Sequence, residues 1–291
     1  MAYQIEYAYA SHVGRIRANN EDNFWCCGET MGAFNQGTGS VRSGRTIQSD
    51  YPLFAVFDGM GGESCGEMAA YLAADACGRH YHEKRLVLKE QPELFFEELC
   101  RSMNRAVCEY SRENRIRTMG TTAVMLAVSE ESIYACNVGD SRLYEVKKET
   151  ADKALVSASC GFQSGEDTQA ASCIRQISTD HVLFGGPFGK APLTQYVGIP
   201  EEDMGLEPSL LKLKPQPGTR YLLCSDGVTD MLSDEEIREI LATEKPVQET
   251  VEQLLNSSLE KGGRDNVTII LCDVAETDRG FRFLRWLRNR R

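Results

Sequence analysis

The chain has 291 residues, of which 42% are hydrophobic and 26% are charged, and its formal net charge at pH 7 is −11. This acidic balance argues against nucleic acid as a partner, because binding to phosphate backbones needs a basic surface. The sequence contains no run of about 18 apolar residues that would predict a membrane-spanning helix, and its first residues do not resemble a signal peptide. The length is sufficient for one large hydrophobic core or two smaller ones.

The eleven cysteines are scattered along the chain. No two of them have the C-x-x-C spacing of a zinc ribbon, and their odd number argues against a complete disulfide framework. Several occupy apolar strand or helix patterns, where cysteine behaves as a small hydrophobic residue. We therefore expect a protein of the reducing cytoplasm.

The first half of the chain predicts one strand and two helices. Residues 28–50 are rich in Gly, Ser, Thr and Gln and predict a long loop. An apolar strand follows at residues 54–57, and an alanine-rich helix is expected over 67–81. A second helix is expected over 92–117, because it begins with proline and has apolar residues at helical spacing.

The second half predicts closely spaced strands over 121–128, 133–138 and 142–146. We interpret the last two as a hairpin with Gly139 and Asp140 in its turn, followed by a polar loop over 147–171. Further strands are expected at 220–224 and 267–274, and helices at a capping box beginning with Ser233 and over 246–261. Connections this short exclude crossover helices, so the pattern favours antiparallel sheets with helices packed outside.

Carboxylates recur at the ends of the predicted strands. The stretch LFAVFDGMGGE ends an apolar run at Asp58, and RYLLCSDG ends another at Asp226. Asp265 precedes the last strand, and RANNED supplies Glu21 and Asp22. One such Asp-Gly pair is equally typical of a plain turn. Several carboxylates brought together would repel one another unless cations lay between them, and Mg²⁺ and Mn²⁺ prefer oxygen ligands of this kind.

Seven segments, in this order, resemble the protein phosphatase 2C (PPM) family of metal-dependent serine/threonine phosphatases, especially its bacterial members. They are VGRIRANNED, FAVFDGMGG, MGTTAVMLAV, ACNVGDSRLY, LTQYVGI, LLCSDGVTDMLSDEEI and GGRDNVTIILCDV. The resemblance extends from about residue 8 to residue 274. It implies a four-layer αββα sandwich, in which two antiparallel sheets are flanked by helices, with a phosphatase domain over residues 1–278.

The resemblance also implies roles for individual residues. Asp58 would bridge two divalent ions, Mn²⁺ or Mg²⁺, and the Gly59 carbonyl would bind the second of them. Asp226 and Asp265 would complete the first. The matching phosphate-binding arginine is Arg17, whose planar guanidinium suits a phosphate group.

Three further carboxylates are less specific. Glu21 and Asp22 would approach the metals either directly or through water. Asp140 resembles the residue that joins Asp226 at a third, weaker metal in bacterial members, although it also fits a simple turn residue. Met60 occupies the position of a histidine proposed as general acid in eukaryotic relatives, so the identity of the acid stays open. The region of residues 181–193 is short for the family's flap, the segment beside the active site.

The resemblance predicts hydrolysis of phosphoserine and phosphothreonine on proteins by water activated between two metal ions. A bacterial serine/threonine kinase would be the opposing partner, and we expect a monomer. One alternative is a regulatory or binding protein of the same fold with weak catalysis. The other is a cysteine-dependent phosphatase, because Cys136 and Arg142 have C-x₅-R spacing. That chemistry needs a helix N-terminus next to the cysteine, whereas this segment alternates like a strand, so we interpret Cys136 as a core residue.

The tail over residues 279–291 contains six arginines, interleaved with aromatic and apolar residues. A helix of this composition would suit an anionic membrane surface or an acidic partner. It would equally suit the acidic surface of its own chain, and the sequence does not choose between these alternatives.

Overall fold

The computed structural model describes residues 3–60, 65–129, 131–148, 172–183, 191–200, 205–243 and 245–276. Two antiparallel sheets form its centre. The first sheet has the order β3 (Arg42–Ile47), β1 (Tyr3–His12), β12 (Val267–Glu276), β11 (Thr219–Cys224), β8 (Arg142–Lys148) and β9 (Ser172–Gln176). The second has the order β10 (Ser209–Leu213), β7 (Ile133–Val138), β6 (Ala123–Val128), β4 (Leu53–Met60) and β2 (Asp22–Cys26), with β5 (Gly120–Thr121) paired to the end of β4.

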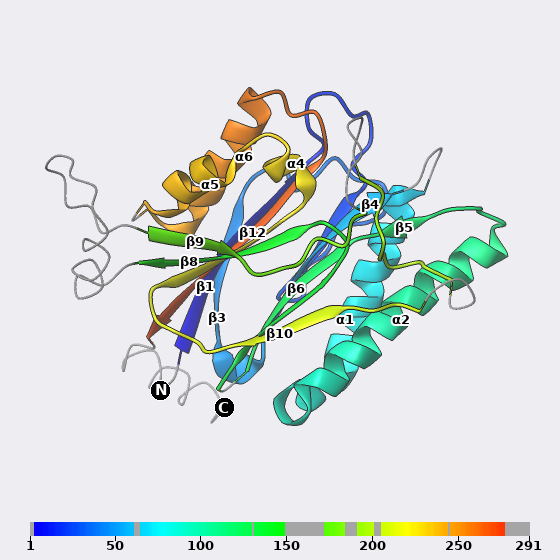
Figure 1. The fold of residues 1–291 in the computed structure, drawn as a ribbon, viewed down its shortest axis with the longest axis horizontal. Coiled ribbons are helices and arrows are strands. Elements are labelled where there is room, and N and C mark those ends of the chain that lie inside the picture. The colour runs from blue at the N-terminus through cyan, green and yellow to red at the C-terminus, as the bar shows by residue number, and fades with distance from the viewer. Residues whose placement is uncertain are drawn as a thin grey trace, which may run out of the picture.

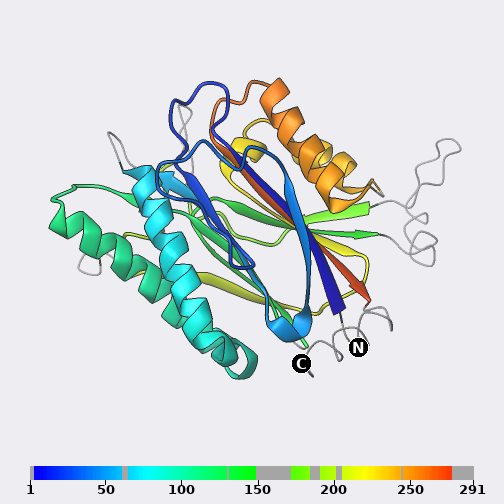
Figure 2. The ribbon, with the colours of Figure 1, turned by 180° about the vertical axis from the view of Figure 1, so that it is seen from behind.

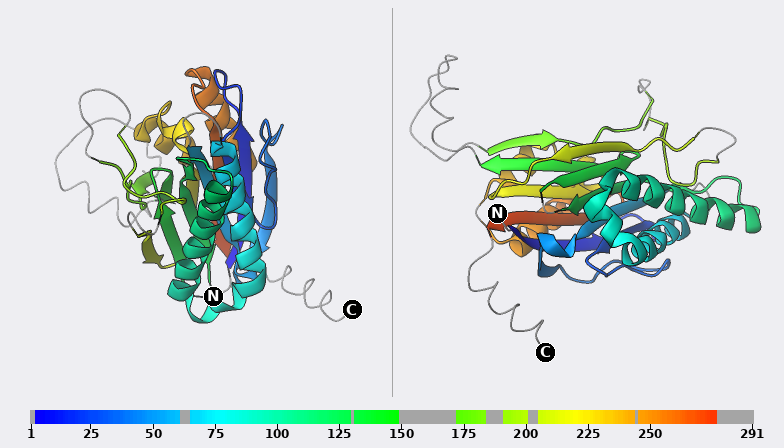
Figure 3. Two further views of the ribbon diagram at one scale, coloured as in Figure 1. Left: turned by 90° about the vertical axis from the view of Figure 1, so that its right-hand side faces the viewer. Right: turned by 90° about the horizontal axis from the view of Figure 1, so that it is seen from below.

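Helices cover the outer faces of both sheets (Figures 1 and 2). The long helices α1 (Gly66–Glu90) and α2 (Pro92–Glu113) lie against the second sheet. The first sheet is covered by α4 (Asp226–Thr229), α5 (Asp234–Leu241) and α6 (Val247–Glu260). A short 3-10 helix, η1 (Gln48–Asp50), follows β3. The predicted four-layer sandwich is therefore confirmed, and the perpendicular views of Figure 3 show the α1–α2 pair at one flank of the strands.

Strand β4 illustrates how side-chain alternation builds these layers. Leu53, Ala55 and Phe57 face α1 and α2, while Phe54 and Val56 enter the core between the two sheets. All five are fully buried, because β4 has a packed layer on each side. Asp58 is the first polar residue at the end of this rigid apolar strand.

The predicted hairpin around Gly139 and Asp140 is wrong. Strand β7 pairs with β6 and β10 in the second sheet, whereas β8 pairs with β11 and β9 in the first. The Gly139–Asp140 connection therefore crosses from one sheet to the other. Alternating polarity predicts which residues are buried but not which strand becomes the partner.

Other boundaries also differ from the sequence prediction. Strands β1 and β2 were not predicted, and the loop expected over 28–50 contains β3, which pairs with β1 at the edge of its sheet. Helix α1 continues to Glu90, nine residues beyond its expected end, and α2 already ends at Glu113. The capping box is confirmed, because Ser233 and Glu236 bond reciprocally at the start of α5.

Three predictions fall wholly or mostly outside the described residues. They concern the polar loop over 147–171, the flap region around residues 184–190, and the basic tail over 279–291 with its proposed domain boundary at residue 278.

Candidate metal and phosphate site

Asp22 and Asp58 lie directly opposite each other on neighbouring strands, at the ends of β2 and β4. Asp22 is almost completely buried. Its Oδ2 accepts a 2.7 Å hydrogen bond from Ser225 Oγ, while its Oδ1 has no hydrogen-bond partner. Burial of an unpaired carboxylate oxygen is costly, so this position is suited to a cation or an ordered water.

The backbone at Asp58 is held in place by two threonines. Its N–H donates to Thr122 Oγ1 at 3.0 Å, and its carbonyl accepts from Thr121 Oγ1 at 2.9 Å and from the Thr122 N–H at 2.8 Å. Gly59 follows, and its N–H donates to the Glu21 carbonyl at 3.2 Å. A side chain at Gly59 would place its Cβ 2.2 Å from the Gly66 carbonyl oxygen, so only glycine permits this close approach of backbones.

Asp226 and Asp265 come from segments that pack against each other. Asp226 is buried at the first turn of α4. A Cβ on the next residue, Gly227, would lie 2.0 Å from the carbonyl oxygen of Asn266, which follows Asp265. Ser225, the residue before Asp226, contacts Asp22 through its hydroxyl group. These contacts place the Asp226 segment between Asp22 and the start of β12.

Asn266 joins the loop of residues 13–21 to this centre. Its Nδ2 donates to the carbonyls of Val13 at 2.8 Å and Asn19 at 2.9 Å, and its Oδ1 accepts from the Glu21 N–H at 2.8 Å. The side chain is nearly fully buried. One amide therefore fixes the loop that carries both Arg17 and Glu21.

Arg17 reaches the same place from that loop. Its Nη2 donates to Asp265 Oδ2 at 2.8 Å, and about half of its side chain is exposed to solvent. The hydrogen bond to Asp265 raises the pKa of Arg17, and the charges of Asp265, Glu21 and Asp58 add to this effect. A charged guanidinium whose hydrogen-bond partner among the described residues is Asp265 thus lies at the edge of the carboxylate group, where an anion could approach it.

Burial and the neighbouring negative charges both raise the pKa of two carboxylates of the site. Burial raises the pKa of Asp22 well above its usual value, and the charges of Asp58 and Asp265 raise it further, against the hydrogen bonds from Thr268 and Ser225. Burial also raises the pKa of Glu21, where Arg17 opposes the effect and Glu67 and Asp265 add to it. A divalent cation would relieve this repulsion directly.

Glu67 is a carboxylate of this group that the sequence analysis missed. It lies in the first turn of α1, and its buried Oε2 has no hydrogen-bond partner. Its neighbour Gly66 packs against Glu21, because a Cβ there would lie 2.5 Å from Glu21 Oε2. The signal was present in the sequence as GE directly after the glycine-rich turn. This signal is weak, because a glutamate in the first turn of a helix also interacts favourably with the helix dipole.

The donor set fits a hard divalent cation, since it consists of carboxylate oxygens, two of which are buried without partners. Within the described residues, no three His, Cys, Asp or Glu side chains already enclose a common point as metal ligands. The structure brings five predicted site residues into one neighbourhood, namely Asp22, Asp58, Asp265, Glu21 and Arg17. It does not define which of their oxygens would bind a metal ion.

Asp140 lies on the connection from β7 to β8, next to Thr122, which holds the Asp58 backbone. Gly139 packs on Thr122, because a Cβ on Gly139 would lie 2.7 Å from Thr122 Cγ2, and Ser141 Oγ is 2.7 Å from Thr122 Oγ1. The same Thr122 oxygen accepts from Asp58 N–H. Asp140 is thus placed beside the site by its neighbours, and its part in binding a third metal stays a prediction.

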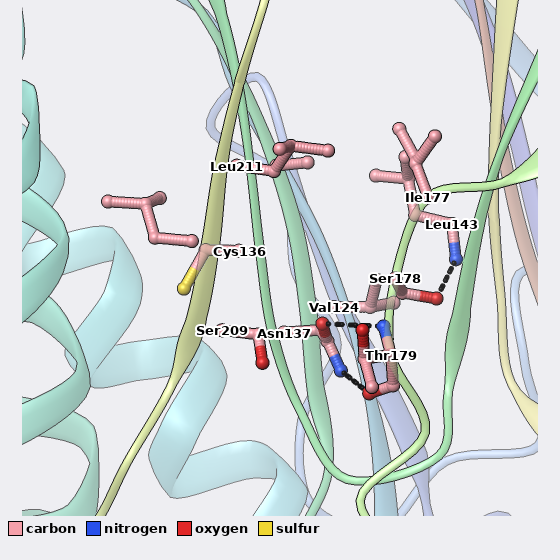
Figure 4. A pocket seen from close by; sticks show the side chains of 11 residues that line it. Val124, Cys136, Asn137, Leu143, Ile177, Ser178, Thr179, Ser209 and Leu211 are labelled. Atoms are coloured by element: carbon pink, nitrogen blue, oxygen red, sulfur yellow. Dashed lines mark hydrogen bonds between the residues drawn. The ribbon is translucent and has the colours of Figure 1, made fainter.

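Cys136 is a core residue, as predicted. It is buried in β7, and its sulfur lies 3.9 Å from that of Cys100 on α2. This contact and burial raise the pKa of its thiol well above the usual value, which is the opposite of what a nucleophilic cysteine needs. Cys136, Leu143 and Thr179 are among the residues that line a cavity of about 220 Å³. In Figure 4 the Cys136 sulfur points away from Leu143 and Thr179. The described residues that line this cavity carry no charged side chain, so it does not suit a phosphate group.

In the part of the chain that is described, no helix has the length and apolar character needed to cross a membrane. Comparison with known families gives a match between residues 38–271 and the family described as protein phosphatase 2C.

Curated relatives cover nearly the whole chain. The serine/threonine phosphatase stp of Listeria monocytogenes serotype 4b (strain F2365) is 27% identical over 274 residues, which cover 92% of this chain and 95% of the relative. Protein phosphatase PhpP of Streptococcus pneumoniae is 26% identical, with 94% and 99% covered. The serine/threonine protein phosphatase PstP of Mycobacterium tuberculosis (strain ATCC 25618 / H37Rv) is 29% identical over 95% of this chain but only 46% of its own length.

Solved structures show the same fold. The catalytic domain of serine/threonine protein phosphatase PstP, in complex with two manganese ions, superposes with a TM-score of 0.68 at 25% identity and covers 94% of this chain and 100% of that one. A bacterial serine phosphatase gives a TM-score of 0.69 at 25% identity, with 94% and 98% covered.

Proposed function

Because the chain belongs to the protein phosphatase 2C family, we propose that it is a metal-dependent phosphatase that hydrolyses phosphoserine and phosphothreonine in proteins. The observation that carries the proposal is the carboxylate pair Asp22–Asp58 on neighbouring strands, in which the buried Asp22 has an oxygen without a hydrogen-bond partner and Arg17 lies alongside. A buried carboxylate oxygen without a partner, as in Asp22, is destabilising unless a cation or a water molecule binds it.

In this proposal Asp58, Asp226, Asp265 and the Gly59 carbonyl hold two divalent ions, with Asp22 and Glu21 contributing directly or through water. When bound, manganese or magnesium would supply an activated water and offset negative charge on the phosphoryl group. The binding of two manganese ions by the PstP catalytic domain supports this choice of cofactor.

The protein's own residues then orient the substrate. Arg17 offers guanidinium donors to the phosphoryl oxygens and keeps its charge, because the hydrogen bond to Asp265 and the neighbouring carboxylates raise its pKa. Its bond to Asp265 fixes the guanidinium before substrate arrives, which reduces the entropy lost on binding. The hydrogen bonds of the Asp58 backbone with Thr121 and Thr122 hold this residue at the strand end, so its carboxylate keeps its position while charge develops on the phosphoryl group.

Phosphate release from a phosphothreonine peptide, measured with and without manganese and after addition of EDTA, tests the proposal. We expect manganese-dependent release that EDTA abolishes. Asp58→Asn should reduce turnover by at least about 100-fold, because electrostatic groups at a reaction centre are typically worth this much. Turnover in the variant equal to that of the unmodified protein would refute the role of Asp58. Absence of release from the unmodified protein with manganese would favour the alternative of a binding protein.

We further propose that the substrates are targets of a bacterial serine/threonine kinase, and that the protein acts as a cytoplasmic monomer. The names of the relatives support phosphorylated proteins as the substrate class. Size-exclusion chromatography with light scattering tests the monomer directly.

A further inference from the structure

A basic pocket lies at the C-terminal end of α2. It has a volume of about 450 Å³ and is lined by the arginines Arg105, Arg112 and Arg117, which are all exposed. Glu109 is the only carboxylate among the described residues that line it. Figures 1 and 3 show that this end of α2 projects beyond the strands before the chain returns to β5.

Several other arginines of the protein make ion pairs with carboxylates, but these three have none among the described residues. Within the described part of the chain, none of the three lies within 4.0 Å of a carboxylate oxygen. By contrast, Arg101 one turn earlier pairs with Glu97, and Arg79 pairs with Asp75. On a chain with a net charge of −11, three arginines that line one hollow with a single carboxylate among its described lining residues favour an anionic ligand.

Helix stability does not account for this arrangement. A cation in the last turn of a helix interacts favourably with the helix dipole, which explains Arg112 alone. Arg105 lies two turns earlier, and Arg117 lies beyond the end of the helix at Glu113. Arg117 joins Arg105 and Arg112 around the pocket because of the course of the chain after α2.

The floor of the pocket is rigid. Asn104 on α2 donates to the Ile199 carbonyl at 3.0 Å, and its Oδ1 accepts from the Gly198 N–H at 2.7 Å. Gly198 has φ +111°, and a Cβ there would lie 2.7 Å from the Met119 carbonyl oxygen. The segment before it is bonded to β5, because Val197 and Thr121 exchange both backbone hydrogen bonds. A preorganised floor lowers the entropic cost of binding.

The pocket is also connected to the metal-binding end of β4. Strand β5 pairs with β4 at Gly59 and Met60. Arg117 is three residues before Gly120, which is the partner of Met60. With about 3.3 Å per extended residue and about 5 Å between paired strands, the Cα atoms of Arg117 and Asp58 are at most roughly 22 Å apart. An extended peptide covers that span in about six residues.

We propose that this pocket binds an anionic side chain of the phosphoprotein substrate, three to six residues from the phosphate that is removed. The proposal rests on the phosphatase function above and adds a substrate class, namely phosphoproteins with acidic or multiply phosphorylated sequences around the target residue. Carboxylates and phosphates share the chemistry that guanidinium groups recognise, and the experiment distinguishes these two sources.

The test compares kcat/KM for phosphothreonine peptides of three kinds. One has neutral flanks, one has two glutamates three to six residues away on either side, and one has a phosphonate analogue of phosphoserine there, which carries the charge but cannot be hydrolysed. We expect kcat/KM to be about tenfold higher for the anionic peptides than for the neutral peptide, because charge-assisted hydrogen bonds to the three arginines would contribute this much. The stronger of the two preferences identifies the source of the anion.

The variant Arg105→Gln/Arg112→Gln/Arg117→Gln should abolish this preference. Hydrolysis of para-nitrophenyl phosphate, which is too small to reach the pocket, should stay unchanged. The matched control, Arg45→Gln/Arg79→Gln/Arg238→Gln, removes as much positive charge from other surfaces, where each arginine has a carboxylate partner, and should keep the preference.

Equal kcat/KM for the neutral and anionic peptides, a preference that survives in the pocket variant, or an equal loss in the control would each overturn the proposal. Peptide binding measured by fluorescence anisotropy separates it from the phosphatase function. If the unmodified protein hydrolyses nothing with manganese, the phosphatase function fails, and tighter binding of the anionic peptides that depends on the three arginines still supports the pocket. Binding that ignores charge refutes it.

Discussion

Replacement of Asn266 by alanine tests whether one buried amide assembles the site. The change removes hydrogen bonds of 2.8, 2.9 and 2.8 Å to Val13, Asn19 and Glu21. At about 1 kcal/mol of net stability for each, the free energy of unfolding should fall by about 3 kcal/mol. Domains of this size lose roughly 2 °C in Tm per kcal/mol, so Tm should fall by about 6 °C.

The effect on activity should exceed the effect on folding. The loop held by Asn266 carries Arg17 and Glu21, and small displacements of such groups cost about 100-fold in rate. Thermal unfolding followed by circular dichroism gives the stability, and phosphopeptide turnover well below Tm gives the activity of the folded variant. Asn114→Ala is the control, because it removes a single exposed hydrogen bond, to Tyr110, and should change stability by less than about 0.5 kcal/mol.

A Tm within 2 °C of the unmodified protein, together with normal turnover, would refute this reasoning. It would mean that the loop of residues 13–21 holds its position without the amide. Loss of stability with full turnover would show that Asn266 supports the fold but does not position the catalytic groups.

Three further predictions concern other positions. Cys136→Ser should leave phosphopeptide turnover within about twofold, because the thiol is a core group, while the buried hydroxyl lowers stability by about 1–3 kcal/mol; a folded but inactive variant would contradict this. Burial lowers the pKa of His80, so below about pH 6.5 the folded state binds fewer protons than the unfolded state. The contribution of neutral His80 to the free energy of unfolding is therefore complete above about pH 6.5 and declines as the pH falls toward the folded pKa. Urea unfolding of His80→Leu and of the unmodified protein should therefore diverge with pH only below about 6.5, and parallel curves would exclude the effect. Gly66→Ala would push a methyl group onto the Glu21 carboxylate and should raise the manganese concentration for half-maximal activity about tenfold, as loss of one charge-assisted contact would; an unchanged value would separate Glu21 from metal binding.

Local signals in the sequence determined several elements correctly. The capping box at Ser233 fixes the start of α5, because both its hydrogen bonds are made within four residues. The apolar run before Asp58 predicted a buried strand, and β4 is buried on both faces. The short connections between residues 121 and 146 indicated antiparallel sheets, since parallel pairing needs long crossovers.

Long-range pairing was decided only by the tertiary structure. Strands β7 and β8 read as one hairpin, yet each finds its partners in a different sheet. Strand β3 is exposed and polar at an edge, so no apolar periodicity marked it. The backbone hydrogen bonds of β3 come from its pairing with β1, which the local sequence of β3 does not predict.

The candidate site follows the same division. The sequence determined that Asp58, Asp226 and Asp265 lie at the ends of strands, because strand and turn signals are local. The tertiary structure decided that Asp22 faces Asp58 across a strand pair, that Asn266 ties the Arg17 loop to Asp265, and that Glu67 joins them. The physical reason is that these carboxylates are brought together by contacts between residues far apart in the chain, such as the bond from Ser225 to Asp22, and no local pattern encodes such contacts.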